Sequence, residues 1–189
     1  MTADGQGQPG RAAFPVVILI GPPGAGKTTV GGELAARLDV RFTDTDASVE
    51  AAVGKPVSDI FIEDGEQAFR ELERAAVAAA IADHDGVVGL GGGAILDLRT
   101  RERLAGQPVV YLRTSFTELA RRVGMDRARP LLIGNPRAQL KALLDQRLPI
   151  YESLAWLTVD TDGRDPAEVA KQIAAAVSVG GPRPARPES

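Results

Sequence analysis

A glycine-rich segment carries the clearest chemical signal in the sequence. Residues 21–28 read Gly-Pro-Pro-Gly-Ala-Gly-Lys-Thr, which fits the phosphate-loop (P-loop) pattern G-x-x-x-x-G-K-[ST]. The apolar run Val16–Ile20 precedes the segment and a helical pattern follows it. In such a setting backbone N–H groups wrap phosphates, and the helix N-terminus adds the positive end of its dipole. The segment therefore predicts a site for ATP or GTP, and the alternative is a glycine-rich turn without a ligand.

Individual roles follow from this pattern. Lys27 would supply a positive charge to the β- and γ-phosphates, and the hydroxyl of Thr28 would reach Mg²⁺. The residues expected to contact the nucleotide in this segment are Gly24, Ala25, Gly26, Lys27, Thr28 and Thr29.

Two carboxylates stand after a weak candidate strand, Arg41–Thr43. Residues i and i+2 of an extended chain face the same side, so Asp44 and Asp46 are expected to point into one site. One carboxylate would lie near Mg²⁺ and the other near the hydroxyl that accepts a phosphoryl group. The alternative is structural, because Asp46 could instead cap a helix that runs through Val49.

Glycines and arginines complete the set of candidate residues. Three glycines, 91–93, directly follow the apolar run Val87–Leu90. Either the chain turns sharply there, or a substrate packs against bare backbone. Arg70, Arg129 and Arg147 are candidates for binding anions, and the alternative for each is a solvated surface charge. Arg129 lies in a glycine-flanked loop of the kind that closes over a phosphoryl transfer site.

Short apolar runs alternate with helical patterns and predict the frame that positions these side chains. Four candidate strands are apolar runs of this kind, namely Val16–Ile20, Val87–Leu90, Val109–Leu112 and Leu157–Val159, and Arg41–Thr43 is a weaker fifth. Helices are expected over 27–38, 65–83, 115–123, 137–149 and 166–178. Asp64 and Gln67 predict a capping box for the second helix, and Asp165 predicts an N-cap for the last. The alternation predicts a doubly wound α/β sheet that binds its ligands beyond the carboxyl ends of the strands.

Composition bounds the function classes. The net charge is −3 with a pI near 5.3, and only 4% of the residues are aromatic, which argues against nucleic-acid binding. The chain has no cysteine, which excludes disulfides, thiolate metal sites and cysteine nucleophiles. The longest apolar run is too short to span a membrane, and the N-terminus lacks the features of a secretory signal. We expect a cytoplasmic protein without membrane or nucleic-acid partners, with one domain over 14–179 between disordered ends at 1–13 and 180–189.

Taken together, the motifs resemble those of the shikimate kinases. The matching segments, in the family's order, are Gly21–Thr28, Asp44–Asp46, Asp64–Glu66 with Phe69-Arg70, Leu90–Ala94, Arg129–Leu132, Arg147 to Tyr151, and Asp160–Asp162. They extend from about residue 16 to 178. The resemblance implies a three-layer α/β/α P-loop kinase fold, similar to that of the nucleoside monophosphate kinases, with a five-stranded parallel sheet and a mobile lid at about 122–137.

The resemblance also implies an activity, namely ATP-dependent phosphorylation of the 3-hydroxyl of shikimate to shikimate 3-phosphate, in the pathway to chorismate and aromatic amino acids. Shikimate would contact Asp46, Arg70, Gly91, Gly92, Gly93 and Arg147. Thr28 and Asp44 would hold Mg²⁺, while Arg129 would approach the ATP phosphates from the lid and Arg122 and Arg164 would flank adenine. The catalytic residues would be Lys27, Asp46 and Arg129, and we expect a monomer.

Two other functions remain open at this point. The first is a different small-molecule P-loop kinase, for gluconate or a nucleoside monophosphate, which shares the P-loop and the lid. The pair Asp44 and Asp46, the three glycines 91–93 and the arginines Arg70 and Arg147 argue against it. The second is a nucleotide-binding regulator without turnover, which the presence of the full set of catalytic candidates makes a poor fit.

Overall fold

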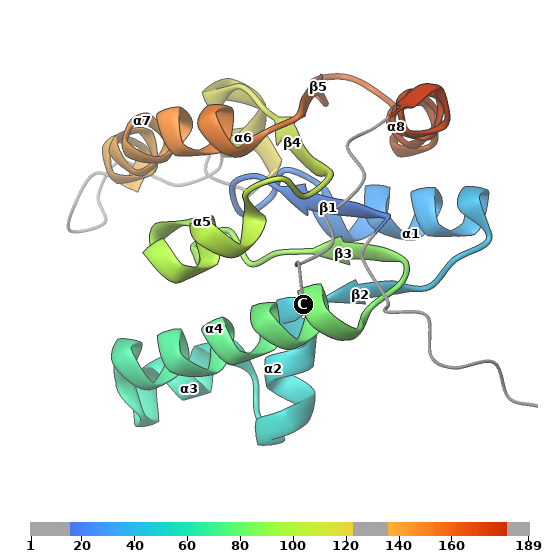
Figure 1. The fold of residues 1–189 in the computed structure, drawn as a ribbon. Helices are drawn as coiled ribbons and strands as arrows, with labels where there is room; N and C mark the ends of the chain where they lie inside the picture. Colours follow the sequence, from blue (N-terminus) through green and yellow to red (C-terminus); the bar gives the residue numbers. More distant parts are fainter. Residues whose placement is uncertain (1–15, 123–135, 181–189) are drawn as a thin grey trace, which may run out of the picture.

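A five-stranded, all-parallel sheet forms the centre of the computed structural model, which describes residues 16–122 and 136–180 (Figure 1). The strands are β1 (Val17–Ile20), β2 (Phe42–Asp44), β3 (Val87–Gly89), β4 (Val109–Arg113) and β5 (Leu157–Asp160). Their spatial order is β2-β3-β1-β4-β5. The central strand β1 is buried over its whole length, which explains its continuous apolar run. The predicted α/β class and the parallel sheet are confirmed.

Helices cover both faces of this sheet. On one face α1 (Lys27–Leu38) packs beside α8 (Pro166–Gly180), while α4 (Gly65–Asp83), α5 (Leu98–Leu104) and α7 (Pro136–Leu154) lie on the other (Figure 1). The short helix α6 (Phe116–Arg122) directly follows β4, and a 3₁₀ turn spans Ala94–Leu96 after β3. Each face has its own apolar core, so the three-layer arrangement follows from burial on both sides of the strands.

Gly31 shows why a glycine stands inside the first helix. A Cβ at this position would collide with the ring of Phe42 on β2, whereas a Cβ at the neighbouring Gly32 would meet nothing. Close packing of helix on strand therefore requires the first glycine and not the second.

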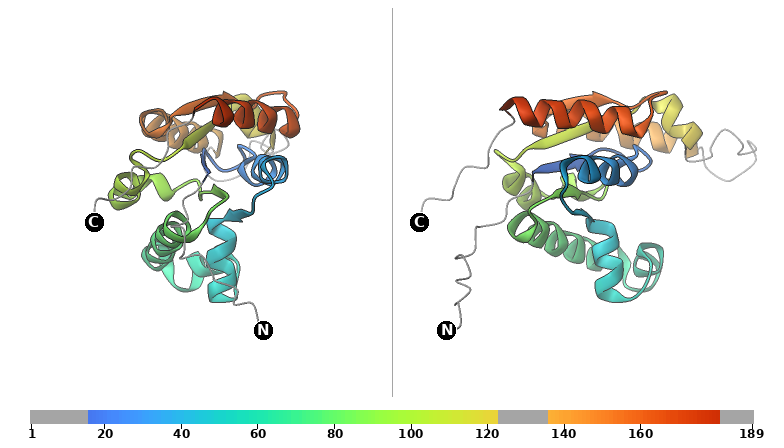
Figure 2. Two further views of the ribbon diagram at one scale, coloured as in Figure 1. Left: turned by 45° about the vertical axis from the view of Figure 1, so that its right-hand side comes forward. Right: turned by 90° about the vertical axis from the view of Figure 1, so that its right-hand side faces the viewer.

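Two short helices form a small lobe beyond the edge strand β2. These are α2 (Thr45–Val53) and α3 (Val57–Glu63), which lie beside α4 (Figure 2). Val49, Ile60 and Phe69 form a separate apolar cluster between the three helices. The sequence predicted neither α3 nor α5, and it offered a helix through Val49 only as an alternative. Helices of nine or seven residues have little intrinsic stability and depend on packing, here against α4 for α2 and α3 and in the core on the other face of the sheet for α5.

Two local predictions are wrong. Asp64 makes no side-chain cap for α4, because its backbone is already in the helical region where α3 passes into α4; its carboxylate pairs with Lys55 at 2.6 Å instead. The helix expected to end at 149 continues through Pro149 to Leu154. The N-cap at Asp165 is confirmed, since its carboxylate accepts the N–H of Ala167 at 2.8 Å.

Some predictions lie outside the described residues. They concern the segment 1–13, most of the lid at about 122–137, Arg129, and residues 181–189 of the tail. The helix α8 continues to Gly180, the first residue assigned to that tail. Within the described ranges, no helix is long and apolar enough to cross a membrane.

Candidate active site

The P-loop lies at the carboxyl end of β1, at the edge of the sheet where the parallel strands all end. Gly24 and Gly26 have φ values of 83° and 92°, which side chains rarely allow, and Gly26 directly precedes α1. The loop therefore presents backbone N–H groups and the helix N-terminus to the same space.

Lys27 folds back over its own loop. Its ammonium donates to the carbonyl oxygens of Gly21 at 2.8 Å and Pro22 at 3.0 Å. Burial lowers the pKa of Lys27 to about 8, against the opposing effect of the Asp46 and Asp44 carboxylates. The cation thus stands in the loop, held by neutral groups that a phosphate can replace.

Asp44 and Asp46 both line the cleft beside the P-loop, but the chain between them is not extended. Thr45 begins α2 and Asp44 is its N-cap, accepting the N–H of Asp46 at 3.0 Å. The capping role considered for Asp46 therefore belongs to Asp44. The second oxygen of Asp44 accepts the hydroxyl of Thr28 at 2.8 Å, which brings together the two predicted Mg²⁺ residues.

The carboxylate of Asp46 makes no hydrogen bond to the part of the chain that the structure describes. Its Oδ1 is buried and has no hydrogen-bond partner among the described residues. Burial, followed by the charges of Asp44 and Glu73, raises the pKa of Asp46 to about 6. A buried acceptor without a partner costs free energy, so this atom is suited to a ligand.

The turn of three glycines after β3 is enclosed by side chains from three other elements. A Cβ at Gly91 would meet the carboxylates of Asp46 and Glu73, and one at Gly93 would meet the guanidinium of Arg70. A Cβ at Gly92 would lie 2.6 Å from Cδ of Pro23 in the P-loop. The backbone of residues 91–93 therefore lies between the predicted substrate residues and the P-loop, with no room for side chains of its own.

Arg70 on α4 is fixed by two glutamates. Its Nη1 donates to Glu73 at 2.8 Å and its Nη2 to Glu66 at 3.1 Å, while the guanidinium lies 5.4 Å from the ring centroid of Phe69. Glu73 is only 4% exposed, and the sequence analysis missed it. The available signal was its place in the apolar stripe of α4, four residues after Phe69 and four before Val77.

Arg147 reaches the same glycine turn from α7, whereas Arg70 reaches it from α4. Its Nη1 donates to the carbonyl oxygen of Gly92 at 2.9 Å. Its Nε is buried and finds no partner in the described part of the chain. The glycine turn thus has two unsatisfied atoms beside it: Arg147 Nε, which is a hydrogen-bond donor, and Asp46 Oδ1, which is an acceptor.

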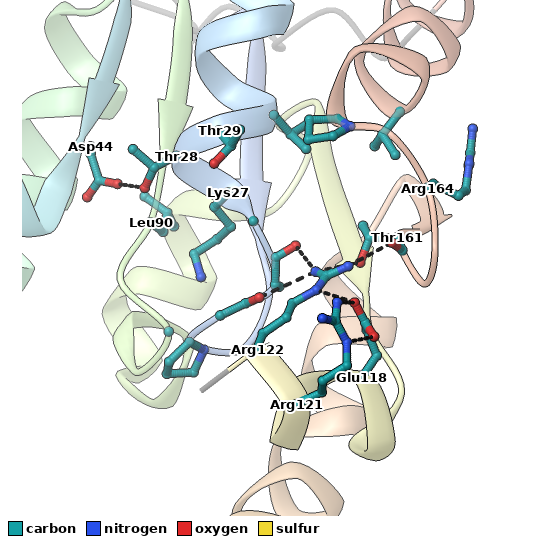
Figure 3. Close-up of a pocket in the computed structure, with 18 of the residues that line it drawn as sticks. Lys27, Thr28, Thr29, Asp44, Leu90, Glu118, Arg121, Arg122, Thr161 and Arg164 are labelled. Carbon is teal, nitrogen blue, oxygen red and sulfur yellow. Dashed lines mark hydrogen bonds and ion pairs between the residues drawn. The ribbon is translucent and has the colours of Figure 1, made fainter. Parts of the chain in front are cut away.

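The cleft has a volume of about 790 Å³ and extends from Asp46 along the P-loop to the loop after β5 (Figure 3). Arg122 crosses its wall, donating to Glu118 at 2.8 Å and to the carbonyl oxygens of Gly24 and Thr161 at 3.4 and 2.8 Å. Arg164 lines the far end. Both predicted adenine residues therefore border the cleft, and Glu118 and Thr161 are lining residues for which the sequence analysis assigned no role.

Comparison with known proteins identifies this arrangement. The family model described as shikimate kinase matches residues 23–178, well over half of the chain. A shikimate kinase of Thermobifida fusca (strain YX) is 64% identical over 160 residues, covering 85% of this chain and 93% of the relative. The chain belongs to the shikimate kinase family.

Further comparisons agree with membership of the shikimate kinase family. A shikimate kinase of Salinispora arenicola (strain CNS-205) is 56% identical over 161 residues, covering 85% of this chain and 96% of the relative. A solved structure of shikimate kinase from Acinetobacter baumannii in complex with shikimate is 34% identical, with a TM-score of 0.80, and covers 88% of this chain and 94% of that one. As a shikimate kinase family member, the chain is an enzyme that uses ATP as co-substrate.

Proposed function

We propose that this chain transfers the γ-phosphoryl group of ATP to the 3-hydroxyl of shikimate, a step in aromatic amino acid biosynthesis. The observation that carries the proposal is the pair of buried, unsatisfied atoms Asp46 Oδ1 and Arg147 Nε. Asp46 and Gly92 line the P-loop cleft, and Arg147 binds the carbonyl oxygen of Gly92 from outside the cleft lining. A small molecule with both hydroxyl and carboxylate groups would satisfy the two together.

Two arginines suit the carboxylate of such a substrate. Arg70 and Arg147 approach the glycine turn from α4 and α7, and each keeps a guanidinium edge close to the backbone of residues 91–93. Charge-assisted hydrogen bonds from a guanidinium fork are strong and directional, so the pair would orient the ring of shikimate as well as bind it.

Asp46 would hold the attacking hydroxyl. The 3-hydroxyl oxygen forms a bond to the γ-phosphorus, the bond from that phosphorus to the β,γ-bridging oxygen breaks, and the hydroxyl proton passes to Asp46 Oδ1. With a pKa of about 6 the carboxylate is still ionised at neutral pH. It is also a stronger base than an ordinary aspartate, which suits it to accept the hydroxyl proton. Lys27 would neutralise the charge that develops on the phosphates, and Arg129 is proposed to add to this from the lid.

The donor set at the start of α1 fits Mg²⁺. The hydroxyl of Thr28 and the carboxylate of Asp44 lie 2.8 Å apart and both offer oxygen, which this hard cation prefers. When held by Thr28 and Asp44, Mg²⁺ would offset the negative charge of the nucleotide phosphates. Arg122 and Arg164 are proposed to border adenine, and the monomeric state and cytoplasmic location stay predictions.

One assay tests the proposal. ADP release is measured with ATP and Mg²⁺ in the presence of shikimate, gluconate or a nucleoside monophosphate. Of these three acceptors, we expect turnover only with shikimate. Turnover with either of the other acceptors but not shikimate would refute the proposed substrate. ADP binding without turnover on any acceptor would favour the regulator.

A further inference from the structure

The carbonyl oxygen of Gly92 accepts two hydrogen bonds from one helix. Arg147 Nη1 donates at 2.9 Å and the hydroxyl of Tyr151 donates at 2.7 Å. The two donors are four residues apart on α7 and therefore share one face of that helix. Arg147 has a part in the proposed reaction, whereas nothing above gives Tyr151 one.

The Gly92 peptide stands between the two substrate sites. Pro23 of the P-loop packs so closely that a Cβ at Gly92 would lie 2.6 Å from its Cδ, while the carbonyl oxygen of the same residue accepts the donors from α7. The position of this one carbonyl group therefore sets how far Arg147 stands from the loop that holds ATP.

Tyr151 is built as a rigid support for that carbonyl. Its side chain is 1% exposed and stacks on Tyr111 of β4, with ring centroids 5.0 Å apart and an interplanar angle of 11°. Tyr111 is part of the central sheet, so the stack ties α7 to the strands. Burial raises the pKa of Tyr151 to about 12, so the hydroxyl keeps its proton at neutral pH and can donate it to the carbonyl oxygen.

We propose that Tyr151 is a positioning residue for the substrate-binding arginine: its hydroxyl occupies one lone pair of the Gly92 carbonyl, so that Arg147 meets this oxygen through Nη1 alone and keeps Nε for the substrate carboxylate. A carbonyl oxygen has two lone pairs. With the tyrosine hydroxyl removed, the arginine becomes the sole described donor to this partly buried oxygen, and its guanidinium turns to place a second N–H there. The inference rests on the proposed function, because it assigns Arg147 to shikimate.

The decisive variant is Tyr151→Phe, which removes the hydroxyl and keeps the ring stack. We expect the KM for shikimate to rise about fivefold to tenfold, which corresponds to one lost hydrogen bond, while kcat and the KM for ATP stay within about twofold. Tyr111→Phe is the matched control, since it removes a hydroxyl from the other ring of the same stack without touching Gly92, and it should leave all three constants unchanged. An unchanged KM for shikimate in Tyr151→Phe would overturn the inference.

Testing Tyr151→Phe in the Arg147→Ala variant as well as in the unaltered chain separates a positioning role from general support of the fold. In Arg147→Ala the arginine to be positioned is missing, so adding Tyr151→Phe should not reduce kcat/KM for shikimate further. An equal reduction in both backgrounds would show that the hydroxyl acts independently of Arg147. ADP affinity, measured by calorimetry, should be unchanged in every variant. Loss of ADP binding in Tyr151→Phe would assign the hydroxyl to folding and would equally overturn the inference.

The unaltered chain keeps the two proposals distinguishable. If it fails to turn over shikimate, the proposed function fails before any variant is compared. If it turns over shikimate and Tyr151→Phe behaves identically, only the role of Tyr151 is refuted.

Discussion

The environment of Lys27 makes nucleotide affinity depend on pH. In the free protein its ammonium is held by two neutral carbonyl groups, and burial lowers its pKa to about 8. Bound phosphates favour the charged form and raise that pKa, so binding takes up a proton and affinity is lost as the pH rises through 8. The protonated fraction is about 90% at pH 7, half at pH 8 and about 10% at pH 9, so the Kd for ADP should rise roughly tenfold from pH 7 to pH 9.

Isothermal titration calorimetry with ADP and Mg²⁺ measures this directly. Repeating the titration at pH 8 in two buffers of different ionisation enthalpy gives the number of protons taken up, which we expect to be about one half. The nucleotide phosphates are already ionised across this range and do not contribute. Lys27→Met is the control: its affinity should be weaker and independent of pH.

A flat affinity between pH 7 and pH 9, with no proton uptake, would refute the reasoning. It would mean that Lys27 is fully protonated in the free protein, and that the carbonyl groups of Gly21 and Pro22 compensate for its burial.

Three further predictions concern the substrate pocket and the core. Because Asp46 must be ionised to accept a proton, kcat/KM for shikimate should fall about tenfold per pH unit below its pKa of about 6; Asp46→Asn should lose about a hundredfold in kcat at pH 7.5, and an acid limb that survived in this variant would contradict the assignment. Arg147→Ala should raise the KM for shikimate about 30-fold to 100-fold and leave ADP affinity unchanged. Weaker ADP binding would show that Arg147 belongs to the nucleotide site and that its assignment to shikimate is wrong. Gly31→Ala should lower the free energy of unfolding by about 1–3 kcal/mol, since its Cβ meets the Phe42 ring, whereas Gly32→Ala should raise it by about 0.5–1 kcal/mol; equal effects in urea denaturation would refute the packing argument.

The parts of the fold that the sequence predicts are those encoded locally. All five strands appear within one or two residues of the expected segments. For β1, β3 and β4 the reason is burial, because a strand buried on both faces requires a continuous apolar run. The P-loop is equally local, since its glycines, Lys27 and Thr28 lie in one segment of eight residues. Five helices were found for the same reason, including α8 with its N-cap at Asp165.

The features that were missed depend on contacts between distant segments. The helix α2 replaces the expected extended chain at Thr45 because the lobe of α2, α3 and α4 buries Val49. Glu73 becomes a site residue only when α4 lies against the glycine turn. The role of Asp44 as a cap requires the geometry of the helix that it starts, which residue types at a spacing of two do not specify.

The glycine turn at 91–93 also bears on how this pocket could change. None of the three glycines has a positive φ, so the backbone conformation alone would accept other residues. Volume limits them instead, and the atoms in the way belong to three parts of the molecule: Asp46 of α2, Glu73 and Arg70 of α4, and Pro23 of the P-loop. A side chain at Gly92 would press on the ring and backbone of Pro23, whereas one at Gly91 or Gly93 would displace the mobile ends of the Asp46, Glu73 or Arg70 side chains. A substitution in the turn therefore changes the acceptor pocket and, at the same time, moves either the P-loop or a side chain beside the proposed shikimate site.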